Sequence, residues 1–186
     1  TGSGMENFTK LQDSIYFLTE EFLIINQFVS SEVTTDAIAL SQEGRLAKED
    51  AIRITIRHTD GKKGLMIRIP EWAKDATIED ANGDARNVDK ESGYWKIPAS
   101  MVTEGAVFVL SFPMHVAAYN LPDGANTYAF QYGPYVLSAR LGTSEQKIGY
   151  HGVTVMVPVK KAVKNDTIGI LSVDSVEEFM AHIEDN

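Results

Sequence analysis

The sequence predicts an all-β fold, namely an antiparallel, jelly-roll-like β-sandwich with a short N-terminal segment and one C-terminal α-helix. Residues 51–58 (AIRITIRH) alternate isoleucine with arginine or threonine, which is typical of a strand with one wet face. Turn residues recur at short intervals along most of the chain, a spacing that favours a sandwich or barrel over a βαβ fold. Residues 106–142 contain two apolar runs of strand length around the turn-rich segment 121–126, and the second run is rich in tyrosine.

The N-terminal part of the chain predicts three strands. Residues 14–19 and 22–29 are expected to form a hairpin, with the pair Glu20-Glu21 as its turn. A single third strand is expected over residues 33–40.

The middle of the chain predicts a second hairpin. Residues 51–58 and 64–69 both alternate, and the Asp60-Gly61 turn lies between them. Pro70 ends the second of these strands, because proline cannot donate to a ladder.

Short strands are expected over residues 76–80 and 93–97, and a longer apolar strand around Val107. After residue 142 the pattern is looser, with strand candidates at 153–157 and 168–173.

The C-terminal tail has a helical pattern. Asp174 or Ser175 can cap a helix, and two glutamates follow in its first turn. One apolar stripe is formed by Val176, Phe179, Met180 and Ile183. The expected organisation is therefore a segment 1–13, a β-sandwich domain 14–173 and an amphipathic helix 174–186.

Composition excludes several classes of function. The net charge of −9 would repel a phosphate backbone, which argues against nucleic acid as a partner. No apolar run approaches the roughly 20 residues of a membrane helix, so no membrane partner is expected. The chain has no cysteine, so it contains no disulfide, thiolate nucleophile or cysteine metal site.

Motifs for catalysis are scarce. The four histidines, at positions 58, 115, 151 and 182, fall in different predicted elements without the spacing of a metal site. Carboxylates are plentiful, and a glycosidase needs only two of them about 5–10 Å apart, a distance that sequence cannot supply. No nucleophile elbow, P-loop or dinucleotide fingerprint occurs.

Aromatic residues are the better candidates for substrate binding, because sugar rings stack on aromatic faces. The candidates near strand ends and turns are Trp72, Tyr94, Trp95 and Tyr119. Core or rim packing with a polar tip in water is the alternative explanation for each of them.

Several segments, in this order, resemble one family. They are GSGMENFTKLQDSIYF, LMIRIPEWAKDATI, GYWKI, AVFVLSFPMHV and YAFQYGPYVLSARLG. Together they resemble glycoside hydrolase family 127, the β-L-arabinofuranosidase-like family formerly known as domain-of-unknown-function family 1680.

The resemblance implies an (α/α)6 catalytic barrel followed by β-sandwich domains, with a zinc-bound cysteine as nucleophile and a glutamate as acid/base. Residues 2–6 (GSGME) match the segment at the end of the barrel, directly after a cysteine pair, so residues 1–13 are expected to be a remnant of the end of that barrel or a linker. With no cysteine in this chain, neither the nucleophile nor the zinc ligands can be carried over, so we expect no catalytic residue and no cofactor here. The implied partner is the missing barrel of the same parent chain, and the family allows a periplasmic, secreted or cytoplasmic location.

Three functional hypotheses follow. The chain could be a non-catalytic β-sandwich domain that packs on and supports the barrel, with self-association through the exposed barrel-facing surface. It could be a carbohydrate-binding module that binds oligosaccharide through exposed aromatics such as Trp72 and Trp95. It could also be a free-standing hydrolase with a carboxylate pair.

Overall fold

The computed structural model describes two compact units, which meet in the sequence at His115 and Val116 and are described here separately. The residues described are 10, 13–46, 49–122, 128–138 and 175–183.

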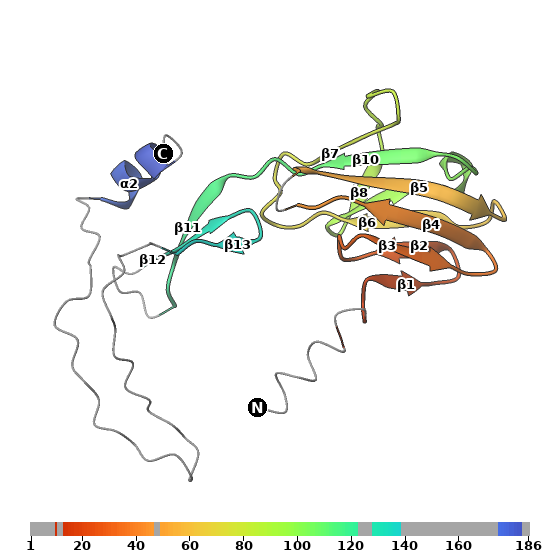
Figure 1. The fold of residues 1–186 in the computed structure, drawn as a ribbon, viewed down its shortest axis with the longest axis horizontal. Coiled ribbons are helices and arrows are strands. Elements are labelled where there is room, and N and C mark those ends of the chain that lie inside the picture. The colour runs from red at the N-terminus through yellow and green to blue at the C-terminus, as the bar shows by residue number, and fades with distance from the viewer. Residues whose placement is uncertain (1–9, 11–12, 47–48, 123–127, 139–174, 184–186) are drawn as a thin grey trace, which may run out of the picture. The chain divides into compact units, whose positions relative to one another are not determined.

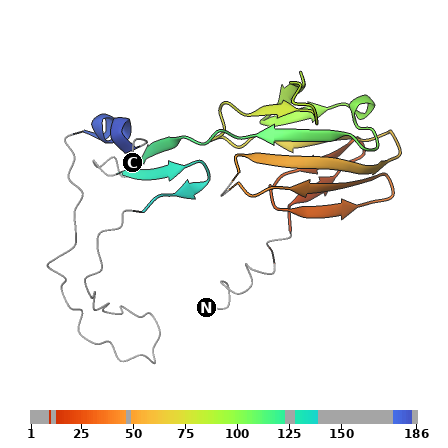
Figure 2. The same cartoon turned by 45° about the horizontal axis from the view of Figure 1, so that its top comes forward.

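The first unit is built from two five-stranded sheets (Figures 1 and 2). The first, here called the β6 sheet, has the strand order β1 (Tyr16–Leu18), β2 (Phe22–Ile25), β6 (Gly64–Arg68), β9 (Tyr94–Ile97) and β8 (Asp89–Glu91). The second, here called the β5 sheet, has the order β3 (Ser31–Thr34), β4 (Ile38–Glu43), β5 (Ala51–Thr59), β10 (Val107–Ser111) and β7 (Thr77–Glu79). A 3-10 turn, η1 (Ala99–Met101), precedes β10.

One hydrophobic core lies between the two sheets. The β6 sheet contributes Leu23, Ile25, Leu65, Ile67, Trp95 and Ile97. The β5 sheet contributes Ile38, Leu40, Ile52, Ile54, Ile56, Ile78, Phe108 and Leu110. Because the inner faces of both sheets contribute side chains to one hydrophobic cluster, the predicted β-sandwich is confirmed.

The alternation over residues 51–58 predicts the inner and outer faces of β5 correctly. Its isoleucines are buried, whereas Arg53 and Arg57 are exposed. Arg57 donates to Glu32 Oε1 on β3 at 2.9 Å, with β4 lying between the two strands. The outer face of β5 is therefore polar and faces water.

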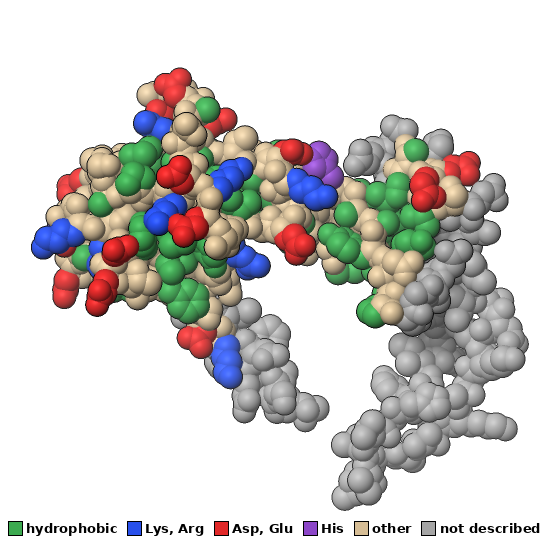
Figure 3. All heavy atoms as spheres, turned by 180° about the vertical axis from the view of Figure 1, so that it is seen from behind, with side chains coloured by type: hydrophobic (Ala, Val, Ile, Leu, Met, Phe, Trp, Pro, Cys, Tyr) green, Lys and Arg blue, Asp and Glu red, His purple; other side chains and the backbone are tan. Residues whose placement is uncertain are grey.

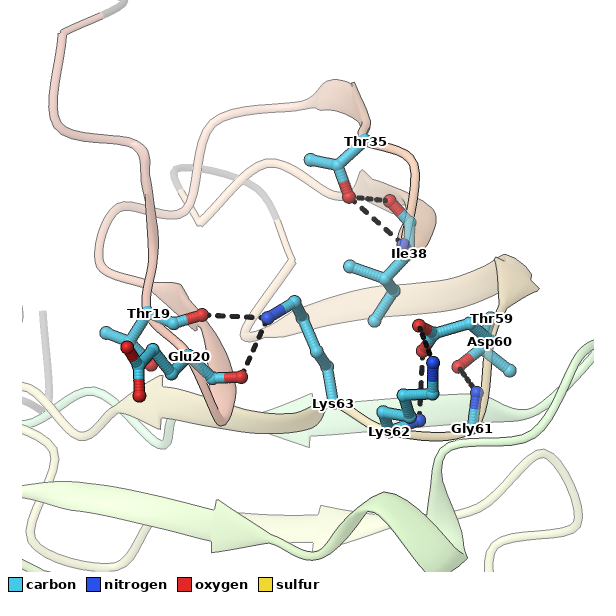
Figure 4. Close-up of polar contacts among 9 residues, drawn as sticks. All are labelled: Thr19, Glu20, Thr35, Ile38, Thr59, Asp60, Gly61, Lys62 and Lys63. Carbon is cyan, nitrogen blue, oxygen red and sulfur yellow. Dashed lines mark hydrogen bonds and ion pairs between the residues drawn. The ribbon is translucent and has the colours of Figure 1, made fainter.

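The predicted hairpin of residues 51–58 and 64–69 is wrong. β5 pairs with β4 and β10, whereas β6 pairs in parallel with β2 and antiparallel with β9. In the connecting turn the N–H of Gly61 donates to Thr59 Oγ1 at 3.0 Å, and that of Lys62 to Asp60 Oδ1 at 2.9 Å (Figure 4). The chain thus crosses from one sheet to the other at this turn, because alternation determines which face is buried but not which strand is the neighbour.

The single strand predicted over residues 33–40 is also wrong, because it is divided between β3 and β4. Thr35 makes the turn: its hydroxyl donates to the carbonyl of Ile38 at 2.8 Å and accepts from the N–H of Ile38 at 3.0 Å (Figure 4). Such hydroxyl-to-backbone bonds favour turns over extended chain.

The hairpin predicted at the N-terminus is confirmed as β1 and β2. Lys63 holds its turn, since Nζ donates to the carbonyls of Thr19 and Glu20, both at 2.8 Å (Figure 4). The short strands predicted at 76–80 and 93–97 are confirmed as β7 and β9. The sequence analysis missed β8, whose three residues are all charged.

The second unit contains a three-stranded antiparallel sheet of β11 (Val116–Asn120), β12 (Tyr128–Tyr132) and β13 (Tyr135–Val136), together with helix α2 (Val176–Ile183). Ser175 caps the helix, since its Oγ accepts from the N–H of Glu178 at 3.0 Å. The Phe179 ring packs on Phe130 with centroids 4.8 Å apart. The strands predicted at 153–157 and 168–173 lie outside the described residues, and the boundaries of the expected 14–173 domain stay a prediction.

Candidate functional site

Trp95 does not lie at a surface. It faces inward from β9, is 1% exposed and lies 6.0 Å from the Phe112 ring, centroid to centroid. Its expected exposure is wrong, because Trp95 shares a strand face with Ile97 and both side chains point into the core. A buried ring offers no face to a sugar.

Trp72 is half-buried and also packs beside Phe112, with ring centroids 6.0 Å apart. Phe28 contacts the same ring at 4.7 Å. The two tryptophans therefore flank one aromatic residue of the core instead of forming a row on the surface.

Tyr94 lies on the outer face of β9, half-buried, and its hydroxyl donates to Asn26 Oδ1 at 3.1 Å. Tyr119 is 45% exposed on β11 and belongs to the second unit. Sugar binding by Trp72, Tyr94 or Tyr119 stays a prediction.

The hollow on the first unit is a feature that the sequence analysis missed. Its volume is about 430 Å³, and it lies between the loop after β7 and the segment from η1 to β10. Its polar lining comprises Asp80, Asn82, Arg86, Ser100 and Thr103. Of the residues that line it, Asp80 is the one acid, so the carboxylate pair of a glycosidase is not found in this hollow.

Asp80 organises the loop beside the hollow. Its Oδ1 accepts from the N–H groups of Asn82 at 2.8 Å and Asp84 at 3.1 Å, and its Oδ2 accepts from Arg86 Nη2 at 2.8 Å. The two backbone donors, and then Arg86, hold the pKa of the Asp80 carboxyl below its ordinary value. Asp80 is therefore ionised near neutral pH, which suits a loop anchor and not a general acid.

Asp80→Asn should make the stability of the protein less dependent on pH in the acid range. A carboxyl with a lowered pKa in the native state stabilises the fold above the unfolded value of about 3.9, and this stabilisation is lost as pH falls through the native pKa. We therefore expect the Tm of the parent to fall more steeply than that of the variant between pH 5 and pH 3. The control, Asp36→Asn, removes an exposed carboxylate in the β3–β4 turn. Equal slopes for the parent and Asp80→Asn would contradict this role.

Among the side chains that the structure describes, no three His, Asp or Glu residues gather into a possible metal site. The zinc and cysteine chemistry that the family resemblance implies does not fit this chain, which lacks cysteine altogether. No step is therefore assigned to zinc here. Within the described residues, no helix has the length and apolar character needed to cross a membrane.

Solved structures that share this architecture include glycoside hydrolases. A protein titled "Glycoside hydrolase" is 24% identical with a TM-score of 0.63, and the match covers 72% of this chain and 24% of that one. The GH127 β-L-arabinofuranosidase of Geobacillus stearothermophilus T6 is 27% identical with a TM-score of 0.56, covering 66% of this chain and 21% of that one. The GH127 β-arabinofuranosidase BT3674 is 21% identical with a TM-score of 0.57, covering 66% and 23%. The chain thus spans about a quarter of the length of these structures.

The fold and these similarities define a β-sandwich module of the glycoside hydrolase class. The family model for "Beta-L-arabinofuranosidase, GH127 middle domain" matches residues 22–114, from the first residue of β2 to the penultimate residue of the first unit. The chain therefore belongs to family GH127, as its sequence motifs predict. No curated protein matches it.

Proposed function

We propose that this chain acts as a non-catalytic β-sandwich domain of a GH127 glycoside hydrolase, where it packs on and supports an (α/α)6 catalytic barrel of the same parent chain. The observation that carries the proposal is the coincidence of the matched middle domain, residues 22–114, with the two-sheet sandwich.

The chemistry of the described residues favours a non-catalytic role for this chain. The hollow has one acid, and both oxygens of its carboxylate accept hydrogen bonds from the loop that it anchors. A hydrolase of the proposed class would need a nucleophile and an acid/base, and in this proposal both come from the barrel.

A second candidate function, carbohydrate binding, is favoured by one observation on the second unit. Tyr132 and Tyr135 are direct partners across β12 and β13, and both rings are 40% exposed. Adjacent exposed aromatic rings can stack on the apolar faces of sugars. Tyr119 on the neighbouring strand β11 is not part of this pair, because its register with Ala129 places it on the other face of the sheet.

The test is hydrolysis of p-nitrophenyl β-L-arabinofuranoside by two proteins, the 186-residue chain and the protein from the reading frame extended upstream through the barrel. We expect hydrolysis from the longer protein alone, and a loss of about 100-fold or more when residues 14–115 are deleted from it. Hydrolysis by the 186-residue chain itself would overturn the proposal in favour of a free-standing hydrolase. Full activity after the deletion would also overturn it. Retention of the 186-residue chain on arabino-oligosaccharide, abolished by Tyr132→Ala, would then favour the binding module.

A further inference from the structure

The outer face of the β6 sheet carries an apolar patch. Leu23 and Ile25 point into the core and lie opposite Leu65 and Ile67, so the residues between them point outward. The same register places neighbouring outward residues on β1 and β9. The apolar members of this outward set, here called the apolar face, are Phe17, Phe22, Ile24, Met66 and Tyr94. The same register also turns Arg68 and Lys96 outward, together with Asp89 and Glu91 on the edge strand β8.

The apolar face crosses four adjacent strands and is open to solvent. Phe17 is 46% exposed and the other four side chains are half-buried. Charged side chains lie directly beside it, since Arg68 is the cross-strand partner of Tyr94 and Lys96 is that of Met66. Lys96 donates to Glu91 at 2.8 Å, and its Nζ lies 5.4 Å from the centroid of the Phe22 ring. Figure 3 shows hydrophobic side chains reaching the surface of this unit among charged ones.

The outer face of the β5 sheet is the internal comparison. Its outward residues include the Glu32–Arg57 ion pair and the exposed side chains of Glu43 and Arg53, and its apolar members Val107 and Val109 are half-buried on β10. Such a polar outer face is what a sheet in water normally presents. Since both faces belong to one sandwich, the cluster of aromatic and aliphatic side chains on the outer face of the β6 sheet needs its own explanation.

The composition of the apolar face favours a protein over a sugar. Ile24 and Met66 lie on its two central strands and offer no hydrogen-bonding group. The hydroxyl of Tyr94, its one polar group, already donates to Asn26. A sugar site needs polar groups that fix the hydroxyls of the ligand, whereas the core of a protein interface is rich in aromatic side chains and methionine.

The path of the chain into the sandwich indicates which protein binds at the apolar face. The chain enters the sandwich through β1, the edge strand of the same sheet, and Phe17 on β1 belongs to the apolar face. The matched family model describes a middle domain, and the match covers 24% of the chain of one solved structure, so most of that chain lies outside it. Resting on the proposed function, we infer that the apolar face is the surface on which the preceding catalytic barrel of the same chain docks.

The test compares oxidation of methionine by hydroxyl radicals in the 186-residue chain and in the longer protein that includes the barrel. Met66 lies on the apolar face, and Met101, which is also half-buried, lines the hollow and serves as a matched internal control. Docking should slow oxidation of Met66 about five-fold or more in the longer protein, because the core of an interface excludes water. Oxidation of Met101 should change less than about two-fold, since a residue outside the interface keeps its solvent.

Each other outcome overturns the inference. Equal oxidation of Met66 in both proteins would do so, and the proposed function would still stand if the longer protein hydrolyses arabinofuranoside and needs residues 14–115. Protection that rises with the concentration of the 186-residue chain would identify a second copy as the occupant. Protection of this chain by arabino-oligosaccharide would identify a sugar. A reading frame with no barrel would remove the proposed function as well.

A pair of variants gives a second readout in the longer protein. Ile24→Lys adds a charge to the apolar face, and Thr55→Lys adds the same charge to the outer face of the β5 sheet. We expect Ile24→Lys alone to restore rapid oxidation of Met66. Equal behaviour of the two variants would contradict docking at this face.

Discussion

Ile54→Asp is expected to abolish the native fold of the first unit. Ile54 is 0% exposed at the centre of β5, opposite Gln42 on β4 and Phe108 on β10. Truncation of a buried isoleucine costs about 2–5 kcal/mol, and burial of an unpaired carboxylate adds several more. The sum is comparable to the roughly 5–15 kcal/mol that stabilises a typical domain. The measurement is a thermal melt monitored by near-ultraviolet circular dichroism, in which the cooperative transition of the parent should be lost.

The next residue along the strand provides the control. Thr55 points to the outer face of the β5 sheet, so Thr55→Asp should cost no more than about 1 kcal/mol, the range of strand propensities. If Ile54→Asp melts within a few degrees of the parent, the assignment of the inner face of β5 is wrong.

Trp95→Ala has the second-largest expected effect. The ring is buried among the residues of the core, beside Phe112 on one side, and Lys90 Nζ lies 5.9 Å from its centroid. Replacement of a buried tryptophan by alanine costs about 3–5 kcal/mol, because it removes apolar contacts and leaves a cavity. Urea denaturation should show this loss as a lower midpoint with little change in slope.

Tyr94→Ala is the matched control, one residue away on the opposite face of β9. Its ring is half-buried and its hydroxyl bond to Asn26 is partly exposed, so we expect about 1–2 kcal/mol. A larger loss for Tyr94→Ala than for Trp95→Ala would mean that the two faces of β9 are exchanged.

The sequence predicts the burial of individual side chains in this protein better than it predicts their neighbours. The alternation in residues 51–58 correctly separates core from solvent in β5. It cannot show that β6 joins the other sheet, because the parallel partner of β6 is β2, far away in the sequence. The charged strand β8 gives no apolar signal at all, and it is held by its ladder to β9.

For the candidate site, too, the sequence predicts the burial of a side chain but not which segments come together. The burial of Trp95 was within reach of the sequence, since the pattern Tyr94-Trp95-Lys96-Ile97 places tryptophan and isoleucine on one face. The hollow could not be predicted from the sequence, because it depends on the distance between the loop of Asp80 and the start of β10. The Asn82-Gly83 turn signals a loop there, but no sequence pattern shows that Asp80 accepts three hydrogen bonds within it.

The parallel pairing of β2 with β6 has a consequence for how the protein folds. The parallel partner of β2 follows it in the sequence only after β3, β4 and β5, which belong to the opposite sheet, so the two sheets are interleaved along the sequence. Closing so long a loop costs entropy before any contact compensates it, which slows folding relative to a sandwich of local hairpins. The same interleaving means that a proteolytic cut anywhere from β2 to β10 separates strands of a common core, so the first unit should resist piecemeal unfolding and be lost as one cooperative whole.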